Sequence, residues 1–173
     1  MNKHPSADFV AQLCPRCGLC CNGVLFATVR LQKGDDVRRL AELGLPLKAQ
    51  ARRPVFPQPC YCLDGTLCRI YSERPKYCRT FACGTLKRVQ AGRLDVDTAL
   101  AKIERARGQA EKVRQLLRRL GDHDETLALT RRYARVMREA VDLSGPKASV
   151  EGRGELMLEV NGLMETLQRD FLA

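Results

Sequence analysis

Apolar side chains recur at helical intervals along the carboxy-terminal half of the chain. A long helix is predicted from about Asp97 to Gly121, because one face of this stretch is apolar and the other carries Arg and Lys. Its apolar face consists of Leu100, Ile103, Ala106, Ala110, Val113, Leu117 and Leu120.

Two signals divide the residues that follow into two further helices. Asp122 and Glu125 have the spacing of a capping box, which predicts a second helix with apolar residues at helical intervals as far as Val141. The Ser-Gly-Pro run at 144–146 ends this helix, and a third is predicted over residues 155–172. The carboxy-terminal half is therefore expected to form a helical hairpin or a three-helix segment.

The amino-terminal half shows shorter patterns. Residues 24–31 are rich in β-branched and apolar side chains and predict a buried strand. Residues 37–43 place apolar side chains three apart behind a capping aspartate, which predicts a short helix ended by Gly44. Four prolines favour a loop over residues 46–59, and residues 9–13 are interpreted as a short turn or strand that leads to the first cysteine.

A tight turn is indicated within the second cysteine-rich stretch. The Asp-Gly pair at 64–65 is typical of a β-hairpin, which would bring Cys60 and Cys68 close together. Pro75 is expected to open a short helix that carries Cys78.

The composition limits what can hold these elements together. The 173 residues suffice for one domain or for a small domain with an appendage. There is no Trp and only nine Phe and Tyr, so the core must rest on aliphatic side chains and bound metal. We predict an α+β fold: a small cysteine-rich, metal-stabilised module with short strands and helices at residues 1–85, followed by a segment of long amphipathic helices at residues 86–173.

The sequence also suggests a cellular compartment. It has no apolar run of signal-peptide length at its start, and no run of the roughly 20 apolar residues that a membrane helix needs. We expect a soluble, cytoplasmic protein with no membrane contact, where thiols stay reduced and nine cysteines do not form a disulfide framework. The net charge of +10 falls to about +6 if eight thiolates bind two divalent ions, which permits nucleic acid or acidic partners without establishing them.

Four of the nine cysteines lie within eight consecutive residues. Cys14 and Cys17 form a C-x2-C pair, which lets two thiolates from one tight turn reach the same ion, and Cys20 repeats the interval. Cys21 breaks the pattern. Because adjacent side chains point in different directions, Cys20 and Cys21 fit two neighbouring ions more easily than one. The stretch is therefore interpreted as half of a cluster whose other half lies at residues 60–83.

The thiolates leave the identity of the metal open. Free cysteines also pack in protein cores, but all nine here fall in two turn-rich windows, which favours metal binding. Zinc in tetrahedral sites of four thiolates is favoured, and iron, singly or in an iron-sulfur cluster, uses the same ligands. Cys14, Cys17 and Cys20 match the start of a ferredoxin run, but the fourth cysteine is at 21 and no Cys-Pro closes the run.

Other residues carry weaker signals. Cys62 would be a ninth ligand for sites that need eight, so it is interpreted as a packed thiol. Arg79, beside Cys78, is interpreted as a hydrogen-bond donor to the thiolate cluster rather than as an exposed charge. The arginine stripe from Arg114 to Arg138 is interpreted as a solvated helix face. No phosphate loop, nucleophile elbow or H-E-x-x-H motif indicates a catalytic site, so an enzymatic activity stays uncertain.

The order of the cysteines and their neighbours resembles a known family. The run Cys-x2-Cys-Gly-x-Cys-Cys at 14–21, followed by the cysteines at 60–83 with Ile-Tyr at 70–71 and Arg-Pro at 74–75, is similar to the bacterial CxxCxxCC family, also called YkgJ-like. That family is described as zinc- or iron-chelating. The resemblance covers about residues 14–83 and implies that the ligands are Cys14, Cys17, Cys20, Cys21, Cys60, Cys68, Cys78 and Cys83.

These observations lead to one functional hypothesis with two alternatives. The chain is predicted to bind two zinc or iron ions through eight thiolates, in closed sites of a structural kind, with the carboxy-terminal helices serving packing or the docking of a protein partner. The first alternative is an iron-sulfur enzyme for redox or methyl-transfer chemistry, since the longer flagellin lysine methylases contain a related cluster. No segment here can be assigned to a methyl donor. The second is a nucleic-acid-binding zinc module that uses the arginine-rich helices.

Overall fold

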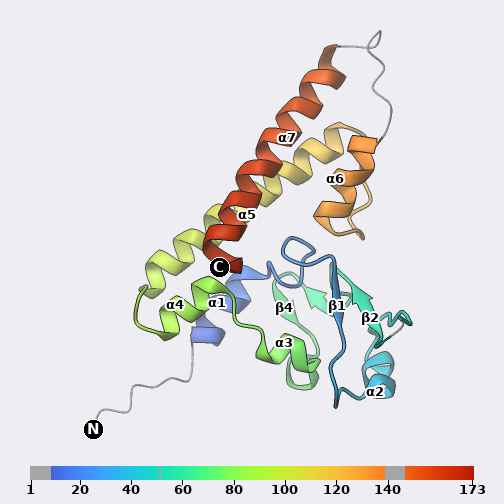
Figure 1. The fold of residues 1–173 in the computed structure, drawn as a ribbon, viewed down its shortest axis with the longest axis vertical. Coiled ribbons are helices and arrows are strands. Elements are labelled where there is room, and N and C mark those ends of the chain that lie inside the picture. Colours follow the sequence, from blue (N-terminus) through green and yellow to red (C-terminus); the bar gives the residue numbers. More distant parts are fainter. Residues whose placement is uncertain (1–8, 51, 139–146) are drawn as a thin grey trace.

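A computed structural model describes residues 9–50, 52–138 and 147–173 of the chain. The fold is α+β, with short strand pairs beside short helices and long helices towards the carboxy terminus (Figure 1). The elements in order are α1 Phe9–Cys17, β1 Thr28–Arg30, α2 Val37–Glu42, β2 Val55–Pro57, β3 Leu63–Asp64, β4 Leu67–Cys68, the 3₁₀ turn η1 Tyr71–Glu73, α3 Lys76–Thr80, α4 Gly84–Gln90, α5 Val96–Arg119, α6 Leu129–Arg138, α7 Lys147–Leu167 and the π-helical turn η2 Gln168–Leu172.

The long helix predicted from the apolar spacing is confirmed as α5. Its amino-terminal cap is Asp95, whose carboxylate accepts a hydrogen bond from the Thr98 amide at 2.8 Å. Its buried face includes Ile103 and Val113, and α7 runs back along α5 while α6 packs on the same helix (Figure 1). Among the described residues, no helix combines the length and the apolar character needed to cross a membrane.

The capping box predicted after α5 is wrong. Asp122 does not cap a helix, because its carboxylate is buried and accepts hydrogen bonds from Arg132 Nε at 2.9 Å and Arg135 Nε at 2.8 Å. The second helix accordingly begins later, at Leu129. The third begins at Lys147, earlier than predicted. The expected end of the second helix at 141 and the break at 144–146 lie outside the described residues.

The amino-terminal predictions hold for the short helices and the hairpin. The helices α2 and α3 form where the capping aspartate and Pro75 predict them, and Leu63 pairs with Cys68 across a turn in which Gly65 has a φ of 59°. Residues 9–13 are wrong as a turn or strand, because they belong to helix α1.

The strand prediction for residues 24–31 is too long. Only Thr28–Arg30 form β1, and they pair antiparallel with β2, so that Val29 lies opposite Phe56. The expected loop at 46–59 is therefore wrong at 55–57, where two buried apolar side chains supply the partner strand.

Two apolar clusters hold the chain. The smaller cluster lies at the strands and includes Val29, Leu40 and Phe56. The larger cluster joins the start of the cysteine-rich region to the helical segment, because Leu13 of α1 packs in it together with Leu117 and other residues of α4, α5, α6, α7 and η2. The domain boundary between residues 85 and 86 stays a prediction.

The carboxy-terminal turn η2 is anchored on α4 and α5. The buried Asp170 carboxylate lies 2.7 Å from Lys102 Nζ and 2.9 Å from Arg169, and its main-chain carbonyl accepts a hydrogen bond from the Thr85 hydroxyl at 2.7 Å. Burial opposes the charge on Asp170, but the hydrogen bonds from Arg169 and Lys102 lower its pKa below the ordinary value. The end of the chain is thus fixed against the helix that begins after Cys83.

Candidate metal centre

A cavity of about 150 Å³ is lined by all eight cysteines that the sequence predicts as ligands. The ninth, Cys62, is not among its lining residues. All nine cysteines are described, and all carry free thiols. The cavity also reaches the helical segment, because Ile103 of α5 and Phe171 of η2 form part of its lining. Sequence spacing gave no signal for these two residues, since each reads as an ordinary apolar position on a distant helix.

The first cysteine window is shaped by the end of a helix. Cys14 and Cys17 lie in the last turns of α1 rather than in a tight turn, and Gly18 ends the helix with a φ of 66°. The chain then turns, so that Cys20 and Cys21 also line the cavity. Cys14 is the most exposed of the eight cysteines.

The second window reaches the cavity from several elements. Cys60 is tied to the first window, because its amide donates a hydrogen bond to the Cys21 carbonyl at 2.7 Å. Cys68 lies in β4 and Cys78 in α3. Cys83 is the amino-terminal cap of α4, and its sulfur accepts a hydrogen bond from the Leu86 amide at 3.5 Å.

Electrostatic interactions link Cys14, Cys17, Cys20 and Cys83, which we call the first group. The pKa of Cys17 is raised to about 12, mainly by burial and to a smaller extent by the neighbouring thiols of Cys83 and Cys14. Burial also raises the pKa of Cys20, and Cys17, Cys21, Cys83 and Cys14 add to this effect. The charge of the Cys83 thiolate raises the pKa of all three other members of the group.

The remaining four cysteines, Cys21, Cys60, Cys68 and Cys78, form a second group. Burial raises the pKa of Cys21 to about 11, and Cys68 is the first thiol that adds to the effect. The pKa of Cys60 and that of Cys78 are each raised to about 12, mainly by burial. Cys21 and Cys68 contribute to both shifts, and Cys62 contributes to that of Cys60. The two groups meet at Cys21, which raises the pKa of Cys20 and whose own pKa is raised by Cys14.

Arg74, not Arg79, is the guanidinium at the cavity. Arg74 is a lining residue, and its charge lowers the pKa of Cys14, Cys21 and Cys78 against the larger opposing effect of burial. Its Nε donates a hydrogen bond to the Tyr71 carbonyl at 2.8 Å, and its guanidinium lies over the Tyr71 ring. Arg79 is exposed, so the role expected for it is wrong. The helix α3 begins only after Pro75, which leaves the residue before this proline free to turn towards the thiols.

Cys62 lies beside Cys60 and Cys68 of the second group, with which it interacts electrostatically, but it does not line the cavity. It exposes 1% of its surface and packs in the smaller apolar cluster with Leu40 and Phe56. Its thiol donates to the Leu43 carbonyl at 3.6 Å. These contacts agree with a packed thiol.

The eight thiols line one cavity but do not have the geometry of a metal site. Within the described residues, no group of three or more His, Cys, Asp or Glu side chains has the arrangement of a metal site. The donor set nevertheless suits a thiophilic ion, because no His, Asp or Glu accompanies the eight cysteines among the described residues that line the cavity. An ion that enters must turn the thiols towards itself and displace their protons.

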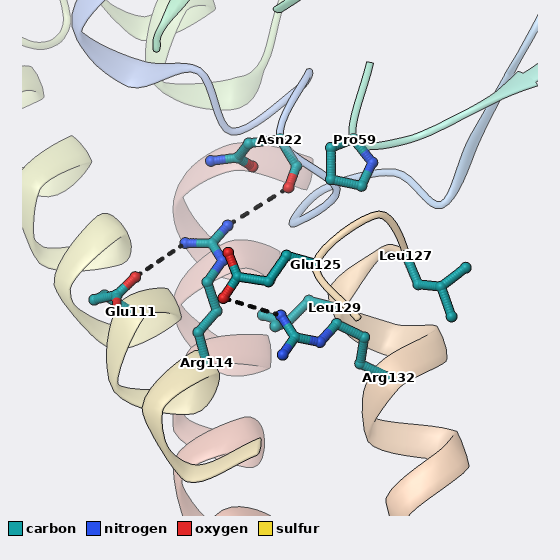
Figure 2. Close-up of a pocket in the computed structure, with 8 residues that line it drawn as sticks. All are labelled: Asn22, Pro59, Glu111, Arg114, Glu125, Leu127, Leu129 and Arg132. Carbon is teal, nitrogen blue, oxygen red and sulfur yellow. Dashed lines mark hydrogen bonds and ion pairs between the residues drawn. The ribbon is translucent and has the colours of Figure 1, made fainter. Parts of the chain in front are cut away.

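A second cavity, of about 310 Å³, lies where the cysteine-rich loops face α5 and α6 (Figure 2). Asn22 and Pro59, the sequence neighbours of Cys21 and Cys60, line it together with arginines and glutamates of the helical segment. Figure 2 shows the Arg114 guanidinium between Glu111 and the main chain of Asn22. None of its described lining residues is a cysteine, so it is distinct from the metal cavity.

The arginines beside this second cavity are engaged in ion pairs. Arg132 and Asp122 each expose only 2% of their side chains and lie 2.9 Å apart. Arg118 pairs with the carboxylates of Glu111 and Glu125. The interpretation of the arginine stripe as a solvated face is therefore wrong for Arg132, and these pairs reduce the positive charge available for a polyanion.

Comparison with known proteins gives one match. The model of the CxxCxxCC family, described as "Putative zinc- or iron-chelating domain", matches residues 13–105. The match extends beyond the motif at 14–83 to include α4 and the first part of α5. No curated protein and no solved structure matches the chain.

Proposed function

The chain belongs to the CxxCxxCC family of zinc- or iron-chelating domains, and from this membership we propose that it binds two metal ions through eight cysteine thiolates. The observation that carries the proposal is that these eight cysteines line one cavity while Cys62 does not. The electrostatic groups suggest the division of ligands. One ion takes Cys14, Cys17, Cys20 and Cys83, and the other takes Cys21, Cys60, Cys68 and Cys78.

Zinc is the proposed metal. Four thiolates close a tetrahedral zinc site without an open position, which supports a structural or metal-holding role rather than catalysis at the ion. Iron is the alternative, because it accepts the same donors. The contact between Cys20 and Cys21 favours an arrangement in which the two ions lie close together, as an iron-sulfur centre for redox or methyl-transfer chemistry would also require.

The charge of the surrounding chain supports a thiolate cluster. Eight thiolates around two divalent ions carry a net charge of about −4. Residues 1–85 contain 13 Lys and Arg against 6 Asp and Glu, so positive charge exceeds negative charge where the cluster lies. Arg74 brings one of these charges to the cavity itself. This distribution supports charge compensation at the cluster over binding of nucleic acid, since several helix arginines are already paired with carboxylates.

The helical segment is proposed to close the metal site. Ile103 and Phe171 contribute apolar surface to the cavity, and both side chains are buried. Apolar walls exclude water and so protect the bound metal from exchange and the thiolates from oxidation. Docking of a partner protein on the outer face of these helices is compatible with this role.

Metal analysis of protein purified without oxygen tests the proposal. We expect two zinc ions per chain, no sulfide and no colour. A brown protein that contains iron and sulfide would support the iron-sulfur alternative, and a chain without metal would refute metal binding.

Cysteine variants test the ligand assignment. Cys21→Ser is expected to lower the metal content, and Cys62→Ser is the matched control that keeps it. Cys17→Ser and Cys78→Ser should each reduce the content from two ions towards one, because each belongs to a different group. Complete loss of both ions in each single variant would contradict two separable sites.

A further inference from the structure

The metal cavity contains one polar side chain that the fold does not explain. Gln58 follows β2, lines the cavity and exposes only 2% of its surface. Its main-chain amide donates a hydrogen bond to the Ala27 carbonyl at 3.1 Å. Its side-chain Oε1, however, is buried and has no hydrogen-bond partner among the described residues. A buried polar group without a partner destabilises a folded protein, so this amide needs a partner within the cavity.

Gln58 lies close in the chain to thiols of the second group. It precedes Cys60 by two residues, and the Cys60 amide is hydrogen-bonded to the Cys21 carbonyl. Both cysteines belong to the second group. The lining around them is largely apolar, with Phe26, Phe56 and other hydrophobic side chains, so an amide there interacts strongly with any nearby charge.

The chemistry of thiolates determines the orientation of the amide. A metal-bound thiolate accepts hydrogen bonds and has no proton to donate, so an amide oxygen facing it is repelled. Half a turn of the Gln58 amide exchanges Oε1 and Nε2 within the same volume. The thiolates then face an N–H donor, and the hydrogen bond spreads their negative charge.

We propose that the Gln58 side-chain amide donates a hydrogen bond to a metal-bound thiolate of the second group, Cys21, Cys60, Cys68 and Cys78. Gln58 is then a positioning residue of the metal centre and not a ninth ligand. This inference rests on the proposed function, because it requires a metal ion in the cavity.

Two substitutions at Gln58 separate hydrogen-bond donation from metal coordination. Gln58→Leu removes the polar group at similar size. Gln58→Glu keeps the shape and the oxygen atoms but replaces the donor by a negative charge. Gln109→Leu is the matched control, because Gln109 of α5 also has a buried Oε1 without a partner but does not line the cavity. Each full-length protein is purified with its metal and titrated with a chromophoric chelator.

The order of metal retention decides the outcome. We expect Gln58→Leu to bind metal about 10-fold more weakly than wild type, the size of effect typical for partners of metal ligands. Gln58→Glu should bind still more weakly, and Gln109→Leu should match wild type. The proposal is overturned if Gln58→Glu retains metal as well as Gln58→Leu or better. Such a result would mean that residue 58 coordinates the metal through oxygen, because a carboxylate is a better oxygen ligand than an amide. Unchanged retention by Gln58→Leu overturns it as well.

A spectroscopic measurement keeps the test independent of stability. Exchange of the bound metal for Co²⁺ gives a thiolate-to-cobalt charge-transfer band, and loss of an N–H donor to sulfur should shift this band of Gln58→Leu to lower energy. An unshifted band contradicts the hydrogen bond. Wild-type protein without metal would overturn the proposed function together with the role of Gln58, whereas metal-loaded wild type with an unaltered Gln58→Leu would overturn the role of Gln58 alone.

Discussion

Replacement of Phe171 by alanine tests whether the carboxy-terminal helices are part of the metal centre. Phe171 exposes 1% of its surface, lines the cavity with the cysteines and belongs to the larger apolar cluster. Truncation of a phenylalanine in such an environment costs about 3–5 kcal/mol of the free energy of unfolding. It also leaves a void beside the thiols, which opens the metal site to water. We therefore expect Phe171→Ala to lose both stability and metal.

Two measurements separate these effects. Urea denaturation of metal-loaded protein gives the loss in the free energy of unfolding, and transfer to a chromophoric chelator at low denaturant gives the rate of metal release. Leu172→Ala is the matched control, because Leu172 is 46% exposed, and it should change stability by no more than about 0.5 kcal/mol. A Phe171→Ala protein that is less stable but releases metal at the wild-type rate would refute the link between the helices and the metal centre.

Three further substitutions probe the contacts that hold the helical segment. Asp122→Ala leaves the buried Arg132 charge unpaired and should cost about 3–5 kcal/mol in urea denaturation, against about 1 kcal/mol or less for the more exposed Asp124→Ala. The pKa of Asp170 is lowered in the folded protein. Its carboxylate therefore stabilises the fold at any pH above the ordinary pKa of 3.8, and this stabilisation is lost as the pH falls through the lowered pKa. The stability gap between metal-free wild type and Asp170→Asn should therefore narrow as the pH falls below 3.8, and a gap that does not narrow there contradicts this assignment. In Gly84→Ala the new Cβ would clash with the main-chain carbonyl oxygen of Ala173, so amide exchange across η2 should accelerate, whereas Gly108→Ala has open space and should leave it unchanged.

The features that the sequence predicted well are those decided by local patterns. The apolar face from Leu100 to Leu120 repeats over many turns, so each position supports the others, and α5 follows it closely. The hairpin at 64–65 depends on a glycine that adopts a positive φ at little cost. The family resemblance implied eight of the nine cysteines as ligands, and the same eight line the cavity, although their role as ligands stays a prediction.

The features that it predicted poorly depend on distant contacts. Val55 and Phe56 lie between prolines, and they form a strand because β1 pairs with them and both side chains become buried. Residues 9–13 form a helix because α1 packs against α4 and α5, far along the chain. Asp122 and Glu125 carry a valid capping pattern, but the pairing of Asp122 with Arg132 outweighs it. Gln58 is an ordinary loop residue in the sequence, and only its burial without a partner makes it notable.

The helical segment contributes residues to the cavity that we propose as the metal site. Cys83 is both a lining thiol and the cap of α4, so a cut after residue 85 would detach this cysteine from the helix that holds it. The family match ends at residue 105 and thus includes Ile103, the residue of α5 that lines the cavity. The far end of the chain then returns, and η2 adds Phe171 to the same lining. Residues 1–85 alone would therefore contain every predicted ligand but lack part of the apolar wall. We expect such a fragment to take up metal and to lose it to a chelator faster than the full chain, and equal rates would show that the ligands alone retain the metal.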